Sequence, residues 1–146
     1  MNKPKIYLAH PMRGKLGSKG DGEYGYQNAN SAIAIENVRW LRKTYPQVEF
    51  YCPGEVETPV QMCSKLGYLT TEQILYMDLC ILQQLCHGGL MHRWEDSEGV
   101  DGEMKKCQDL GYPWVLVTDS PHIQLCNQKP IKIFIQEVLN YCKHVS

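Results

Sequence analysis

Short apolar runs alternate with longer stretches of helical periodicity along the chain, and this alternation is the feature that most constrains the fold. The runs have the length of buried strands and are bounded by glycine, proline or polar residues. Right-handed crossovers between such strands make the sheet parallel and put helices on both of its faces. The expected strands are residues 5–9, 48–52, 88–92 and 114–117, and the expected helices are residues 28–45, 70–85, the stretch between Ser97 and Gly111, and 129–142.

Two segments have a less regular pattern. Residues 53–67 contain Pro53, Gly54 and Pro59, which predicts a loop with one helical turn. Residues 123–128 are either irregular or a short edge strand. The chain is therefore predicted to form one α/β domain over residues 1–146, with a parallel sheet of four or five strands and helices on both faces.

Composition limits the classes of protein that the chain can belong to. The chain has 146 residues, 43% of them hydrophobic, which suits one compact domain with a real core. The formal net charge of -1 predicts no broad basic surface for a nucleic acid polymer. No apolar stretch approaches the roughly 20 residues of a membrane span. These features predict a soluble cytoplasmic protein.

The seven cysteines include no C-x-x-C pair. Their odd number and their apolar surroundings favour reduced thiols that fill the core over a set of disulfides. A zinc site formed by Cys86, His87 and His92 is the alternative, but adjacent cysteine and histidine have poor spacing for ligands of one ion. We therefore expect no metal.

A carboxylate is predicted on the buried face of the helix that follows Ser97. Val100, Met104 and Cys107 recur at helical spacing, and Glu103 projects from the same side. An isolated buried charge costs several kcal/mol or more, so such a carboxylate must be partnered, protonated or used in chemistry. If the helix is rotated, Glu103 is instead an ordinary solvated side chain.

Asp78 is a second carboxylate of this kind, because it falls four residues after Ile74 and three before Ile81 in an apolar stripe. Its alternative role is to cap a neighbouring helix. Two carboxylates in one apolar cleft are the groups that glycosidic bond cleavage needs. We expect Glu103, near a helix N-terminus, to be ionised and to attack or stabilise the anomeric carbon. Asp78 would then handle a proton or orient the sugar.

The end of the first strand is predicted to meet these carboxylates, because the carboxyl ends of parallel strands gather at one edge of a sheet. Tyr7 could hydrogen-bond the attacking carboxylate and hold its rotamer. Arg13 can bind a phosphate bidentately, and Gly14 allows the backbone to approach it. Ser97 could cap the helix that follows, while Gly99 and Gly102 leave backbone N–H groups of that helix uncovered for the same phosphate. The alternatives are a surface arginine and a serine that only caps its helix.

Three stretches of the sequence occur in a recognisable order, namely Tyr7 to Gly14, Asp78-Leu79 with Leu82-Gln83-Gln84, and Ser97 to Glu103. Together they resemble the ordered motif set of the nucleoside 2-deoxyribosyltransferase superfamily, and most closely its branch of 2'-deoxynucleoside 5'-monophosphate N-glycosidases. The stretch from Trp94 to Ser97 also resembles small bacterial and phage members of that superfamily. The resemblance covers roughly the first 118 residues. It implies a flavodoxin-like (Rossmann-like) fold, a homodimer and no cofactor.

The resemblance also implies an activity and a set of roles. The activity is hydrolysis of the N-glycosidic bond of a (deoxy)nucleoside 5'-monophosphate through a covalent glycosyl-enzyme, which gives free base and sugar 5-phosphate. Glu103 would be the nucleophile, Tyr7 would position it, and Asp78 would assist the sugar and the leaving base. The residues implied to bind the substrate are His10, Pro11, Met12, Arg13, Gly14, Trp94, Ser97, Gly99 and Val100, with the Ser97 hydroxyl selecting monophosphates.

Two other functions remain open from the sequence. Transfer of the sugar to a second base shares the covalent intermediate with hydrolysis and differs in what intercepts it. A nucleotide-binding module without turnover is the other alternative, although a binder gains nothing from burying two like charges.

Overall fold

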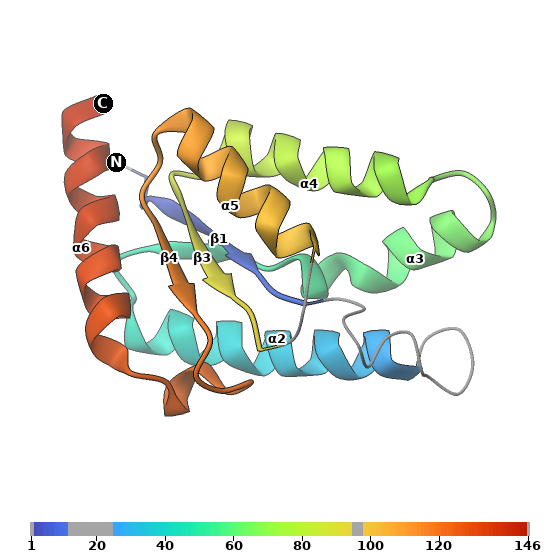
Figure 1. Ribbon diagram of the computed structural model, residues 1–146, viewed down its shortest axis with the longest axis horizontal. Coiled ribbons are helices and arrows are strands. Elements are labelled where there is room, and N and C mark those ends of the chain that lie inside the picture. The colour runs from blue at the N-terminus through green and yellow to red at the C-terminus, as the bar shows by residue number, and fades with distance from the viewer. Residues whose placement is uncertain (1, 12–24, 95–97, 146) are drawn as a thin grey trace.

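The computed structural model describes residues 2–11, 25–94 and 98–145. Figure 1 shows the strands and helices in this part of the chain. In chain order they are β1 (Lys5–Ala9), α2 (Gly25–Thr44), β2 (Glu49–Tyr51), the 3-10 helix η1 (Pro53–Val56), α3 (Glu57–Lys65), α4 (Thr71–Leu85), β3 (Gly88–His92), α5 (Glu98–Leu110), β4 (Trp114–Val117), the 3-10 helix η2 (Ile123–Leu125) and α6 (Gln128–Val145).

The strands form one sheet in the order β2-β1-β3-β4, and every neighbouring pair is parallel (Figure 1). Tyr7 in β1 lies opposite Tyr51 in β2 and Gly89 in β3, and Gly89 in turn lies opposite Trp114 in β4. The predicted α/β class and parallel sheet are therefore confirmed. Within the described residues the sheet has four strands.

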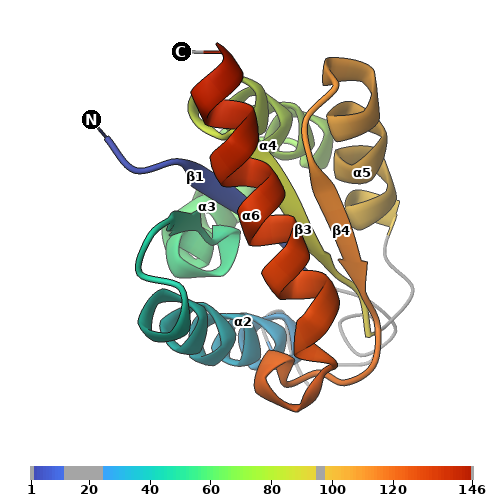
Figure 2. The same cartoon turned by 90° about the vertical axis from the view of Figure 1, so that its left-hand side faces the viewer.

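The two faces of the sheet carry separate cores, because successive side chains of a strand point to opposite faces. Ile6 and Leu8 of β1 pack with side chains of α2 and α6. Tyr7 and Ala9 of the same strand pack with side chains of α4 and α5. Figure 2 shows α2 and α5 on opposite sides of the sheet. The helices thus cover both faces, as the alternating pattern predicted.

A glycine pair at the start of β3 allows α5 and α6 to approach this strand closely. A Cβ on Gly89 would meet the Met91 side chain and would lie 2.9 Å from the Cys107 sulfur of α5. A Cβ on Gly88 would lie 3.0 Å from Val138 of α6. This close approach brings the inner face of α5 onto the sheet.

Several predicted helix ends are confirmed. The Thr70 hydroxyl accepts a hydrogen bond from the Gln73 N–H at 3.1 Å, and the Thr70 N–H donates to Gln73 Oε1 at 2.8 Å. This reciprocal pair caps α4. Helix α5 ends just before Gly111, which has a φ of 70° and so adopts the left-handed conformation that glycine favours at helix ends.

One local prediction was wrong, and the structure decides between the two alternatives left open for another segment. Residues 53–67 were expected to be a loop with one helical turn, but they form η1 and the nine-residue helix α3. Pro59 is compatible with α3 because it lies in the first turn, where the missing N–H has no partner within the helix. Residues 123–128 are not an edge strand, since Ile123 begins η2 and its N–H donates to Asn37 Oδ1 at 3.1 Å.

The last helix is longer than predicted, because α6 begins at Gln128 and ends at Val145. Pro130 is its third residue and lies within the first turn, where a proline is tolerated. In the part of the chain that is described, no helix has both the length and the apolar character needed to cross a membrane.

Candidate functional site

Glu103 lies on the inner face of α5, with only 8% of its surface exposed. It precedes Cys107 by one helical turn, and Cys107 packs on Gly89 of β3, so the same face of α5 meets the sheet. The Tyr7 hydroxyl of β1 donates a hydrogen bond to Glu103 Oε1 at 2.9 Å. Tyr7 is itself fully buried. The predicted contact between Tyr7 and the carboxyl group is therefore present.

Asp78 of α4 lies on the same side of the sheet and is half-buried. Its charge is close enough to raise the pKa values of both Tyr7 and Glu103. Three elements, β1, α4 and α5, thus bring Tyr7, Asp78 and Glu103 together. The two carboxyl groups are borne by different helices, and the charge of each raises the pKa of Tyr7.

Glu103 differs electrostatically from what the sequence predicted. Burial raises its pKa to about 8, the hydrogen bond from Tyr7 opposes this rise, and the charge of Asp78 adds to it. The expectation that the helix N-terminus keeps Glu103 ionised was wrong. Glu103 lies more than one turn after Glu98, where α5 begins, and the effect of the helix dipole decays within the first turn. Desolvation therefore dominates, and Glu103 is mainly protonated at pH 7.

Tyr51 is a further member of this cluster that sequence reasoning missed. Its ring centroid lies 5.5 Å from that of Tyr7, at an interplanar angle of 34°. Its pKa is raised to about 12, first by burial and then by the charge of Asp78. The alternation of β2 was an available signal, because Tyr51 lies opposite Tyr7 in the β1–β2 register and so shares its face.

His10 does not join this cluster. Its Nδ1 donates to the Pro11 carbonyl at 3.2 Å, and its Nε2 accepts a hydrogen bond from the Gly54 N–H at 3.2 Å. The Cys52 sulfur lies 3.8 Å from the same Nε2. Burial lowers the His10 pKa to about 4, so the ring is neutral. The imidazole thus joins β1 to η1 on the α2 side of the sheet, and both of its nitrogen atoms are occupied by the protein.

The other predicted substrate-binding residues are only partly placed. Pro11 is buried at the end of β1, and Val100 belongs to the buried core beneath α5. Gly99 is half-buried in the first turn of α5. Trp94 is half-buried and its ring centroid lies 4.7 Å from that of His92. The remaining four predicted residues lie outside the described residues, namely Met12, Arg13, Gly14 and Ser97.

His92 is the centre of a buried polar network at the end of β3. Its Nε2 donates to the Ser120 carbonyl at 2.6 Å, and its Nδ1 lies 3.4 Å from Asn37 Nδ2. The Asn37 amide also donates to the Pro121 carbonyl at 2.8 Å. Burial lowers the His92 pKa to about 4. This network holds the turn after β4 against α2.

The alternative zinc site from the sequence is not assembled. His87 Nδ1 accepts a hydrogen bond from the Lys5 N–H at 3.0 Å, and His92 faces Asn37 on the opposite side of the sheet from the core that contains Cys86. Over residues 2–11, 25–94 and 98–145, no three potential ligands lie close enough to hold a metal ion. All seven cysteines are free thiols.

Comparison of the chain with protein-family models, with curated proteins and with solved structures finds no match. The chemistry that this site can perform must therefore be argued from its own residues. A buried carboxyl group with a hydroxyl donor and a second carboxyl group nearby can form and release an ester with a sugar.

Proposed function

We propose that the chain is an N-glycosidase of the nucleoside 2-deoxyribosyltransferase superfamily that hydrolyses a (deoxy)nucleoside 5'-monophosphate to free base and sugar 5-phosphate. The observation that carries this proposal is the hydrogen bond from the Tyr7 hydroxyl to the buried Glu103 carboxyl group, with Asp78 close by. Burial of a carboxyl group costs stability, which favours a chemical role for Glu103, and the hydrogen bond from Tyr7 fixes the carboxyl group as a nucleophile requires.

In the first step, an oxygen of the ionised Glu103 attacks the anomeric carbon and forms an ester with it. The bond between this carbon and the base nitrogen breaks, the electron pair leaves with the base, and the base takes a proton from water, while the ionised Asp78 orients the sugar. In the second step, water attacks the same carbon and the ester breaks. Glu103 recovers its charge, and Asp78 takes the proton released by the attacking water and passes it to the solvent, which balances the proton that the base took from water.

The environment of Glu103 gives this mechanism a distinct pH dependence. Only the ionised carboxylate can attack, and burial holds the Glu103 pKa at about 8. About a tenth of the molecules therefore carry the nucleophilic form at pH 7. A carboxylate of raised pKa is also more basic and a better nucleophile than one exposed to water. We expect the rate to rise with pH until Glu103 is fully ionised.

Tyr7 contributes by orienting the carboxyl group. Its hydroxyl holds Oε1, which leaves Oε2 as the oxygen of attack. The same hydrogen bond stabilises the charge that Glu103 regains when the ester breaks. Tyr51, stacked beside Tyr7, limits the movement of that ring. Tyr7 is accordingly a positioning residue and Glu103 the group that reacts.

We assign the phosphate of the substrate to Arg13, Gly14, Ser97 and Gly99, as the resemblance implies. The only member of this set within the described residues is Gly99, in the first turn of α5, and the N-terminus of a helix favours an anion. We also propose, on the same resemblance, that the chain acts as a homodimer in the cytoplasm and needs no cofactor. The free thiols agree with that compartment.

The test is a screen of the common ribo- and deoxynucleoside 5'-monophosphates as substrates at pH 8.5. Chromatography measures the base that is released. Wild type is compared with Glu103→Gln and with Glu36→Gln, a matched change at an exposed position on α2. We expect base release that Glu103→Gln reduces by at least about a thousandfold and that Glu36→Gln leaves unchanged. A foreign base added to the mixture separates hydrolysis from transfer, because transfer gives a new nucleotide.

The proposal fails if no nucleotide releases its base, or if Glu103→Gln retains wild-type activity. Nucleotide binding without base release from any of these substrates would identify a binding module instead. Isothermal titration with the same nucleotides distinguishes these outcomes.

A further inference from the structure

The open edge of the sheet at β4 is apolar and lacks the features that usually protect an edge strand. The sequence of β4 is Trp114-Val115-Leu116-Val117, with no charge and no proline. Natural edge strands are commonly protected by charged residues, proline or a bulge. Figure 2 shows β4 between α5 and α6, with no element drawn over it. This edge is therefore suited to pairing with another strand.

The backbone groups available on this edge follow from the pairing with β3. The Gly89 N–H donates to the Pro113 carbonyl, and the Arg93 N–H donates to the Val117 carbonyl. In a parallel ladder, alternate residues direct their backbone groups to opposite sides, so Trp114 and Leu116 direct theirs away from β3. The Leu116 side chain is 42% exposed at this edge.

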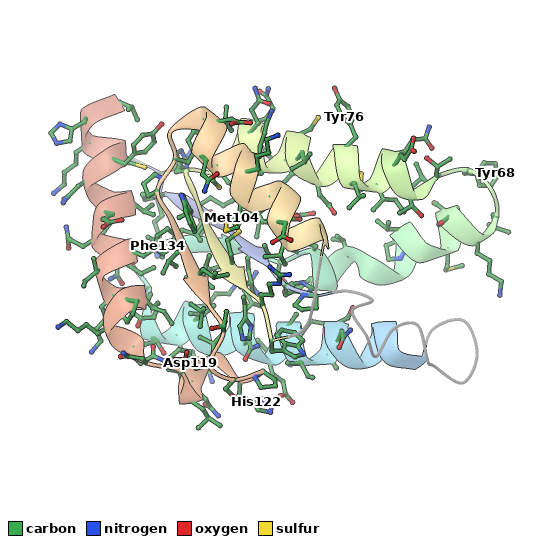
Figure 3. All side chains as sticks on the ribbon, viewed as in Figure 1. Tyr68, Tyr76, Met104, Asp119, His122 and Phe134 are labelled. Carbon is green, nitrogen blue, oxygen red and sulfur yellow. The ribbon has the colours of Figure 1, made fainter. Side chains whose placement is uncertain are left out.

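A hollow of about 390 Å³ lies between β4 and the first half of α6. Trp114 and Val115 of β4 line one side of it, and Ile133 and Phe134 of α6 line the other. Figure 3 shows Phe134 between α6 and β4. Ile133 is 51% exposed although it borders this apolar hollow. Exposed apolar surface beside an open sheet edge is a surface that a partner can cover.

The charges on α6 indicate what that partner is. Lys129, Ile133 and Glu137 follow one another at intervals of four residues, so they form one stripe along the helix, and all three border the hollow. The stripe has a cation at one end, an apolar residue at its centre and an anion at the other end. No ion pair joins either charge to another residue in the described part of the chain. Such a stripe complements a reversed copy of itself.

We infer that two copies of the chain associate about a two-fold axis beside Ile133, with their β4 edges antiparallel and their α6 helices side by side in opposite directions. Lys129 of each copy then faces Glu137 of the other, and Ile133 of each copy covers the hollow of the other. The two sheets become one continuous sheet. This inference names the surface of the proposed homodimer and does not depend on the proposed reaction.

Charge reversal tests this arrangement by sedimentation equilibrium of the full chain at low ionic strength. With Lys129→Glu alone, each of the two contacts between residues 129 and 137 across the interface brings two anions together. With Glu137→Lys alone, each of these contacts brings two cations together. We expect each variant to weaken dimerisation by at least about tenfold. An equal mixture of the two variants restores attraction at both positions, so it is expected to form a heterodimer with affinity near that of wild type. The double variant, with Lys129→Glu and Glu137→Lys in one chain, should also dimerise with affinity near that of wild type.

A second variant and a control complete the experiment. Ile133→Glu puts two like charges next to the axis and is expected to give a monomer, while circular dichroism reports whether each variant folds. Tyr76→Lys is the control, because Tyr76 is 71% exposed and projects outward from α4, away from β4 (Figure 3). It should leave the dimer unchanged.

Three results would each overturn the inference. They are a wild-type chain that stays monomeric at the highest concentration it reaches, charge reversals that leave the dimer intact, and weakened single variants whose mixture does not recover. A dimer that Tyr76→Lys dissociates while the reversals on α6 do not would place the interface on α4. The base-release screen is independent of all these results, so failure of the interface and failure of the proposed activity are distinguishable.

Discussion

Replacing Glu103 by glutamine should stabilise the protein, and the gain should grow with pH. The pKa of Glu103 in the folded chain is about 8, against an ordinary value of 4.5. Between these values the folded state holds a proton that the unfolded state has released. Rising pH therefore favours the unfolded state and lowers the stability of wild type. Glutamine has no proton to lose, so the variant is free of this effect.

The size of the gain follows from the raised pKa. The free energy of unfolding of wild type should fall, relative to that of the variant, by about 1.36 kcal/mol for each pH unit from about 4.5 to about 8. At pH 7 the accumulated difference is about 3 kcal/mol. In a domain of 146 residues this corresponds to a rise in Tm of about 6 to 12 °C.

Urea unfolding of both proteins at a series of pH values from 4 to 9 measures this difference. At pH 4 the Glu103 carboxyl group is neutral in the folded chain, so the difference there reports the exchange of acid for amide and serves as the baseline. Glu36→Gln on the exposed side of α2 is the matched control and should follow wild type at every pH. Parallel stability curves for wild type and Glu103→Gln would refute the reasoning, because they would mean that Glu103 titrates alike in the folded and unfolded chains.

Two further predictions concern the same region. The Tyr7 hydrogen bond lowers the Glu103 pKa and the Asp78 charge raises it. In base-release assays, Tyr7→Phe should therefore move the rising limb of kcat/KM against pH to higher pH, and Asp78→Asn should move it to lower pH, each by about 0.5 to 1 pH unit. Shifts of both variants in the same direction would contradict the assignment. Gly89→Ala should destabilise the fold by about 1 to 3 kcal/mol in urea unfolding, because the added Cβ meets side chains of β3 and α5. Gly102→Ala is the control, because the added Cβ meets no described atom within 4 Å. This variant should stabilise α5 by up to about 1 kcal/mol. A loss of stability at Gly102 as large as that at Gly89 would exclude close packing as the cause.

Raised pKa and burial make Glu103 both a source of instability and the basis of the proposed chemistry. A solvated carboxylate at this position would cost the fold nothing, but it would be less basic. Stabilisation by Glu103→Gln together with loss of base release would show both properties in one variant. Stabilisation alone would establish the burial without the activity.

The periodic features were predictable because they depend on local geometry. Alternation along β1 predicts which neighbours share a face of the sheet with the Tyr7 side chain. Helical spacing in α5 predicts that the Glu103 side chain faces the sheet. The start of a helix at residue 70 was predictable because the Thr70 side chain bonds within its own turn. In each case the contacts that fix the structure lie within a few residues along the chain, or on the face of the strand or helix that the periodicity of its side chains defines.

The failures share a different cause. Residues 53–67 carry two prolines and read as a loop, yet the chain between β2 and α4 is helical. Residues 123–128 are apolar enough for a strand, but Asn37, distant in sequence, takes the Ile123 N–H. His10, one of the residues predicted to line the substrate site, accepts a hydrogen bond from the N–H of Gly54, which is 44 residues away in the sequence. No local pattern encodes these partners.

The sequence by itself determined the α/β alternation, the parallel strands and the buried faces that carry Glu103 and Asp78, because each of these is a periodicity of side chains along one segment. The tertiary structure alone decided that the Tyr7 hydroxyl meets Glu103 and that Tyr51 stacks beside Tyr7. It also decided that Glu103 holds its proton at neutral pH. Proton affinity depends on how completely neighbouring elements exclude water, and that exclusion exists only once the helices have packed on the sheet.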